Sequence, residues 1–138
     1  MTLEPTRSPR RNGTEGGAAA VEFALILPVL LLLLFGIIAF GEFYSRYQVF
    51  TGAVREGARV ASTRQTPSEV RARITEAADP YVLSQTPSIS VSSGGSRCTP
   101  ATVGESVTVS WTQEFEIALP FTPAIDADVD IKGVFRCE

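Results

Sequence analysis

The sequence predicts an α+β protein with a long N-terminal helix that first spans a membrane, a second short helix, and a small antiparallel sheet of three or four strands. Two observations predict this class. Residues 23–40 carry no charge over eighteen positions, and beyond Pro80 the apolar residues change from a spacing of three and four to a spacing of two. A length of 138 residues leaves room for one membrane segment and one small domain.

Residues 1–17 form a polar leader that contains Pro, Gly and three arginines and shows no pattern of core packing. The apolar helix follows at residues 18–40. Eighteen helical residues span about 27 Å, close to the ~30 Å hydrocarbon core of a bilayer. A buried helix of a soluble protein is the alternative, but the run from Leu30 to Phe35 offers no polar face to solvent. We therefore expect a single-pass membrane protein that contacts membrane lipid.

The orientation of the membrane helix is not decided by charge, because equal numbers of arginines flank it. They are Arg7, Arg10 and Arg11 before the helix and Arg46, Arg55 and Arg59 after it. The N-terminal flank is short and the C-terminal part is long, and long regions translocate largely regardless of charge. Cys98 and Cys137 both follow the helix, and a disulfide between them would favour an extracytoplasmic position. Two free buried thiols are the alternative. We expect a cytoplasmic N-terminus and an extracytoplasmic C-terminal domain.

The helix is expected to continue outside the membrane through residues 41–65. Apolar or small residues recur there at spacings of three and four: Phe43, Tyr47, Phe50, Val54, Gly57 and Ala61. Proline does not interrupt this pattern before Pro67, so one continuous helix from about Ala18 to about Thr63 is predicted. Tyr44 and Tyr47 lie where an aromatic interface belt is expected. Ala53, Gly57 and Ala61 allow close approach, and we favour packing under the protein's own sheet over a partner interface.

Residues 66–138 are predicted to form an extracytoplasmic α+β domain that opens with a second helix. Thr66-Pro67-Ser68-Glu69 has the form of a capping box with Pro at the first helical position. Val70, Ile74 and Ala77 or Ala78 give the helix one apolar stripe, and Pro80 ends it.

The rest of this domain alternates as strands do. Ile89 and Val91 alternate with serines ahead of a Gly94-Gly95 turn. A second strand is predicted where apolar residues take every other position: Val107, Val109, Trp111, Phe115 and Ile117. Pro120 and Pro123 mark a loop, and a last strand contains Val129, Ile131 and Phe135, with Gly133 as a candidate β-bulge. The apolar face of this sheet needs cover, and the two helices are the candidates.

Composition argues against enzymatic and nucleic-acid-binding classes. The net charge is −3 and spread along the chain, and the sequence has no His and no phosphate-binding loop. We therefore expect no catalytic residues, no cofactor and no nucleic-acid partner. Asp126, Asp128 and Asp130 resemble half of a calcium loop, but Ile131 stands where Gly is needed and Cys137 where Glu is needed. A solvated strand face explains the three aspartates better, so no metal site is predicted.

Two residues of the apolar run carry a functional hypothesis. Glu22 lies at its entry, where a carboxylate is costly and by default marks function; a snorkelling interfacial residue is the alternative. Pro28 removes a backbone hydrogen bond and frees the carbonyl of Ala24. This proline is interpreted as a kink or flexible point in the helix that is used when the protein leaves the membrane. An ordinary proline tolerated in a membrane helix is an equal alternative.

The segment from Gly17 to Pro28, GAAAVEFALILP, resembles the cleavage region of type IV prepilins and, more closely, the opening of the TadE-like family. These proteins are minor pseudopilins of tight-adherence pili. The resemblance continues at residues 53–59, which read AVREGAR, and more faintly at the valine-rich residues 104–109. TadF- and TadG-like proteins share much of the same opening.

The resemblance implies that a membrane peptidase of the prepilin type cuts between Gly17 and Ala18, so that Glu22 becomes the fifth mature residue. It implies partners among other pilins or pseudopilins and the pilus assembly machinery. Glu22 and Pro28 would serve assembly, and a packing patch would comprise Ala53, Gly57, Ala58, Arg59 and Ala61.

The function expected from this resemblance is assembly of tight-adherence pili, which serve surface attachment. A protein of this kind is a substrate of the peptidase and not an enzyme. The alternative is a membrane-anchored extracytoplasmic binding domain that is never processed.

Overall fold

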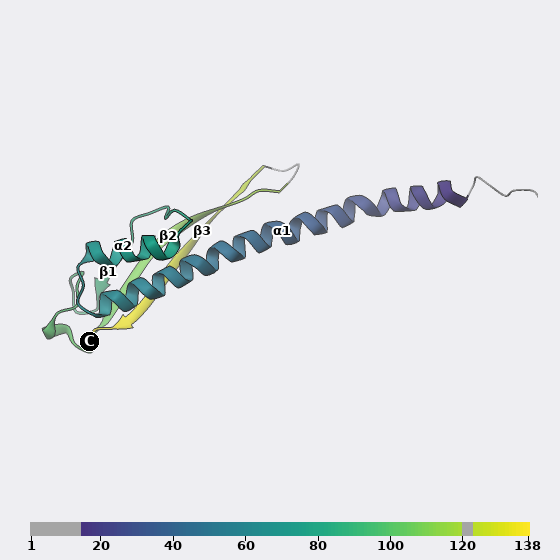
Figure 1. The fold of residues 1–138 in the computed structure, drawn as a ribbon. Helices are drawn as coiled ribbons and strands as arrows, with labels where there is room; N and C mark the ends of the chain where they lie inside the picture. Colours follow the sequence, from purple (N-terminus) through teal and green to yellow (C-terminus); the bar gives the residue numbers. More distant parts are fainter. Residues whose placement is uncertain (1–14, 120–122) are drawn as a thin grey trace, which may run out of the picture. The chain divides into compact units, whose positions relative to one another are not determined.

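The computed structural model describes residues 15–119 and 123–138. Most of the leader, including its three arginines, and the loop residue Pro120 lie outside these ranges. The elements are two helices, a short 3₁₀ turn and three strands (Figure 1): α1 Glu15–Ser62, α2 Pro67–Ala78, β1 Ser88–Val91, η1 Pro100–Thr102, β2 Ser106–Ile117 and β3 Ile125–Arg136. The predicted α+β class, with a long first helix, a short second helix and a small antiparallel sheet, is confirmed.

The described chain forms two compact units, one ending at Gly36 and the other comprising Ile37–Glu138. Helix α1 contributes to both, and it stays helical through Pro28. In the first unit its large apolar side chains are exposed, as Leu25 and Leu32 illustrate at 73% and 72% of their surface. Among the described residues α1 is the one helix long and apolar enough to cross a membrane, judged by length and composition.

Helix α2 begins as its sequence predicts. The side chain of Thr66 accepts a hydrogen bond from the backbone N–H of Glu69, and the Glu69 carboxylate accepts one from the Thr66 N–H at 2.8 Å. This reciprocal capping satisfies two backbone donors that the helix itself leaves unpaired. Val70, Ile74 and Ala78 form the buried stripe of the helix.

The three strands form one antiparallel sheet in the order β1-β2-β3. β2 alternates strictly, so that one face is buried and the other faces solvent. The buried side chains are Val107, Val109, Trp111, Gln113 and Phe115. Four-residue β1 pairs only with Val107–Ser110 of the twelve-residue β2, whereas β3 pairs along its whole length.

The expectation of a β-bulge at Gly133 is wrong. The β2–β3 register runs without interruption through Val109↔Gly133 and Ser110↔Lys132. Gly133 is explained by a close helix approach instead, because a Cβ there would lie 2.8 Å from the backbone oxygen of Val54 on α1. A glycine is therefore needed at this position for packing and not for strand geometry.

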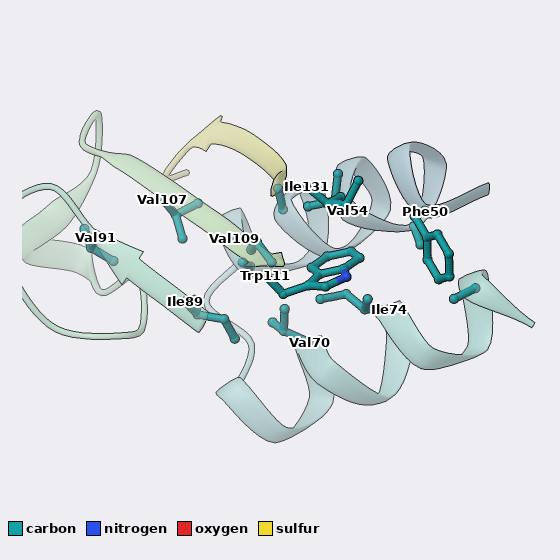
Figure 2. Close-up of a cluster of buried hydrophobic side chains, with 14 of the residues drawn as sticks. Phe50, Val54, Val70, Ile74, Ile89, Val91, Val107, Val109, Trp111 and Ile131 are labelled. Atoms are coloured by element: carbon teal, nitrogen blue, oxygen red, sulfur yellow. The ribbon is translucent and has the colours of Figure 1, made fainter. Parts of the chain in front are cut away.

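The hydrophobic core of the second unit lies between one face of the sheet and the two helices. Figure 2 shows Phe50 and Val54 from α1, Val70 and Ile74 from α2, and Trp111 from β2 converging on it. The predicted cover of the sheet by both helices is therefore present. A disulfide between Cys98 and Cys137 borders this core, with a Cα–Cα distance of 5.6 Å and both residues nearly fully buried. This bridge ties the segment after β1 to the residue that follows β3.

Candidate functional site

The residues predicted to direct processing and assembly lie on the first part of α1. Gly17, Ala18 and Glu22 are helical and exposed. Glu22 has no hydrogen bond or ion pair with any described residue. Ala18 and Glu22 are four residues apart, so they are neighbours on one face of the helix. The structure therefore places a lone carboxylate one turn beyond the predicted cut, on an exposed apolar helix.

The predicted small-residue patch lies in the second unit, inside the protein's own core. Ala53, Ala58 and Ala61 are nearly fully buried. Gly57 faces α2 so closely that a Cβ would lie 2.3 Å from Cγ1 of Ile74. Arg59 is the exception, because its side chain is exposed and pairs with Glu56. The four small residues are consequently occupied in packing α1 against α2 and the sheet.

A charged network that the sequence analysis did not identify joins the two helices. Glu56 of α1 accepts hydrogen bonds from Arg59, at 2.8 and 2.9 Å, and from Arg73 of α2, at 3.2 Å. These two guanidinium groups lower the pKa of Glu56 from 4.5 to about 2. Arg73 also binds Glu76 at 2.8 Å. The spacing of Glu56 and Arg59 could have suggested a helix-surface pair, but Arg73 comes from another element and depends on the tertiary fold.

Aromatic side chains connect α1 to the far end of the sheet, and this cluster was also not identified from the sequence. Phe43 meets Phe115 edge-on with ring centroids 4.9 Å apart. Phe50 contacts both Phe115 and Trp111 in the same T-shaped manner, at 5.8 and 6.5 Å. The favourable edge-to-face geometry fixes the end of β2 against the part of α1 that follows the charge-free run. The spacing of Phe43 and Phe50 predicted an inward face but not its partners.

A cavity of about 590 Å³ opens beside this cluster. Its lining combines aromatic rings with charged and polar groups: Arg46, Phe50, Tyr81, Val82, Ser84, Gln113, Glu114, Phe115, Glu116, Asp126 and Asp128. The guanidinium of Arg46 lies over the ring of Tyr81 at 5.6 Å from its centroid. The buried Gln113 side chain accepts hydrogen bonds from the Ser84 N–H and the Trp111 indole N–H. The side-chain oxygen of Gln113 therefore already has two hydrogen-bond donors within the fold.

The carboxylates of the β2–β3 hairpin lie along its solvent face. Asp126 lies directly opposite Glu116, and Asp128 opposite Glu114, on the solvent face of β2 and β3. Within residues 15–119 and 123–138, no three His, Cys, Asp or Glu side chains are placed to hold a metal ion. The three aspartates of β3 are exposed, as expected for a solvated strand face.

Comparison with known proteins locates the resemblance on the helix. Residues 17–59 match the sequence model of a family described as TadE-like protein. The match covers the predicted cleavage site, Glu22, Pro28 and most of the small-residue patch, and it ends before α2. No curated protein and no solved structure matches this chain. The resemblance to the TadE-like family predicted from the sequence is thereby confirmed over residues 17–59, and it supports a role connected with pili.

Proposed function

We propose that this chain is a pseudopilin-like membrane protein required for the assembly of tight-adherence pili. A peptidase of the prepilin type would remove residues 1–17, and residues 18–40 would span the membrane. The N-terminus would be cytoplasmic and the sheet domain extracytoplasmic. Other pilins or pseudopilins and the assembly machinery would be its partners.

One observation carries the proposal more than any other. Within the segment that matches the TadE-like family, Glu22 is a carboxylate at the entry of an exposed apolar helix, five residues after Gly17, and it pairs with no residue of the described ranges. Burying such a group in lipid is costly unless it finds a partner. Cleavage after Gly17 would create that partner, because it would expose the α-amino group of Ala18.

The amine of Ala18 and the carboxylate of Glu22 could pair within one chain or between neighbouring chains. The four-residue spacing brings them together on one helix face, and a neighbouring helix could present either group instead. An ion pair in lipid stabilises only when its geometry is good, so it would select correctly aligned helices. Repeated head-to-tail packing of this kind generates an open filament.

The proposed cut is tested by N-terminal sequencing of the protein from membranes that contain the matching peptidase. We expect a mature chain that begins at Ala18, with its net charge changed from −3 to −4 because the leader carries three Arg and two Glu. Gly17→Leu should abolish processing, since a bulky side chain would not fit a site that accepts Gly. Val21→Leu is a matched control that adds bulk on the other side of the cut. An intact Met1 in the parent protein would instead support an unprocessed membrane-anchored binding domain.

The role of Glu22 is tested separately from cleavage. Glu22→Gln keeps the size of the side chain and removes its charge, so membrane insertion should be unchanged or slightly improved. Processing should continue because Gly17 is intact. Co-purification with other pilins from membranes, and the number of surface pili, should fall. If Glu22→Gln associates and supports pili like the parent, Glu22 is an ordinary interfacial residue and the ion-pair mechanism fails.

A further inference from the structure

The end of the β2–β3 hairpin, here residues 117–118 and 124–125, follows the part of β2 that packs beside the turn of α1 where the charge-free run ends. Phe115 packs on Phe43. A small hollow there is lined by Ala39, Glu42, Phe43 and Arg46 of α1 together with Phe115, Glu116 and Ala118 of the hairpin. Figure 1 shows β2 and β3 beside the C-terminal part of α1. The last residues of β2 therefore reach the level of Ala39, which is itself part of the charge-free run.

Apolar side chains are exposed on both elements at this level. On α1, Ile37 and Phe40 are 71% and 67% exposed. On the hairpin, Ile125 is 55% exposed and pairs with the partly exposed Ile117 in the last register position of the sheet. Ala118 and Ala124, which flank this pair along the chain, are also exposed. Exposed apolar side chains are therefore present on both the hairpin end and the neighbouring turns of α1.

We propose that the end of the β2–β3 hairpin is a second lipid-binding element, which inserts Ile117 and Ile125 into the interface of the membrane that α1 crosses. The proposal rests on the membrane-spanning role proposed above for residues 18–40. If the helix leaves the hydrocarbon near Phe40, then side chains packed at the level of Ala39 meet the head-group region. Apolar atoms gain free energy by leaving water there. Two attachment points, one helical and one on the sheet, would also hold the domain in one orientation on the membrane.

The charges of the hairpin determine which lipid head groups it can bind. Glu116 and Asp126 form the adjacent register pair, and Glu114 and Asp128 form the pair two positions further on, so both pairs lie on the solvent face. Four carboxylates limit the depth of insertion and are repelled by anionic head groups. They are attracted by the ammonium groups of zwitterionic head groups. The binding surface is therefore a zwitterionic membrane, and anionic lipid should weaken the contact at the hairpin while leaving the helix inserted.

The test places an environment-sensitive fluorophore on single introduced cysteines in the full chain, reconstituted in phosphatidylcholine vesicles that contain head-group-level spin-labelled lipid. The sites are Ile125→Cys on the hairpin, Phe40→Cys on the helix, and Val103→Cys as a distant control. Val103 is 57% exposed and precedes the opposite end of β2, a strand about 40 Å long. We expect several-fold stronger quenching at positions 40 and 125 than at position 103, and weaker quenching at position 125 alone when phosphatidylglycerol is added.

The outcomes separate this inference from the proposed membrane span. Quenching at position 40 with position 125 behaving like position 103 would overturn the hairpin contact and leave the membrane helix intact. Absence of quenching at position 40 would contradict the proposed membrane span and, because the hairpin contact rests on it, the hairpin contact as well. The fluorophore at position 125 could instead show a blue-shifted emission without quenching by the lipid label. If that shift disappears when the protein is diluted in the vesicles, the hairpin end contacts a neighbouring protein chain, and lipid binding is contradicted. Ile117→Asp should reduce quenching at position 125 to the level of position 103 while the emission of buried Trp111 stays unchanged.

Discussion

Gly57 lies where α1 and α2 approach most closely, and its missing side chain makes that approach possible. A Cβ at this position would lie 2.3 Å from Cγ1 and 2.6 Å from Cδ1 of Ile74, which is fully buried. Glycine has a poor helix propensity, and at this position the close approach of Ile74 gives it a packing role. The four-residue spacing of small residues predicted close packing but not that α2 would be the neighbour.

Gly57→Ala should therefore destabilise the domain by about 1–3 kcal/mol, because overpacking forces the helices apart. Gly52→Ala is the matched control on the same helix, where a Cβ meets nothing within 4 Å. It should be neutral or stabilise by up to about 1 kcal/mol, as expected for replacing glycine in an exposed helix position. Both are measured by urea unfolding in detergent, followed by the fluorescence of Trp111, the single tryptophan of the chain. Equal stability of the two variants would contradict the packing role of Gly57.

At the scale of elements, α1 and α2 are joined by charge as well as by packing. Glu56 of α1 is held ionised by Arg59 on its own helix and by Arg73 on α2, which lowers its pKa to about 2. Its pKa in the unfolded chain is near the ordinary value of 4.5. Because the folded pKa is the lower one, ionised Glu56 stabilises the fold above about pH 4.5, and this contribution is lost as the pH falls toward 2.

Glu56→Gln should consequently lower the stability of the protein at pH 6 and have a smaller effect at pH 3. The comparison is made by urea unfolding of parent and variant at both pH values. The control is the same substitution in a background that carries Arg59→Gln and Arg73→Gln, where the pH-dependent difference should disappear. A difference that persists in that background would mean that the two arginines do not cause it.

The elements differ in how far the sequence could predict them. The capping box at Thr66 and the strict alternation of β2 are local signals, and both were confirmed in position. Gly133 was misinterpreted because a strand glycine signals either a bulge or a close approach, and only the position of Val54 decides between them. The contact of Phe43 with Phe115 joins residues far apart in the sequence, so no periodicity could have paired them.

At the scale of the whole molecule, candidate functional residues could be predicted from the sequence in the matched family segment, whereas the cavity of the sheet domain could not. Gly17 and Glu22 were predicted as functional residues from a short linear pattern, and the family match covers that pattern. Their roles stay predictions. The cavity lined by Arg46, Tyr81 and Asp126 brings together three distant segments, so it follows only from the tertiary fold. The predicted boundaries at residues 17 and 40 depend on a peptidase and a membrane, and they stay predictions.

Residues 137–138 are joined to the rest of the domain by a disulfide and by hydrogen bonds. Cys137 is bonded to Cys98, the N–H of Glu138 donates to the carbonyl of Ser62 at the end of α1, and Arg64 donates to the Glu138 carbonyl. The disulfide spans 39 residues. It therefore restricts the unfolded chain considerably, while the hydrogen bonds join the last residue to the C-terminal end of α1 and to the turn that follows it.

Replacing both cysteines, Cys98→Ala with Cys137→Ala, should reduce the free energy of unfolding by roughly 4 kcal/mol in the chain-entropy treatment of a loop of this size. The double variant avoids an unpaired thiol, and urea unfolding of the full chain in detergent measures the loss. The same bond reports the orientation of the protein, because disulfides form and persist outside the cytoplasm. Alkylation of the parent in its native membrane, before any reductant is added, should modify neither thiol, and reduction should make both reactive. Two thiols that react without reduction would place the domain in a reducing compartment and would contradict the proposed topology.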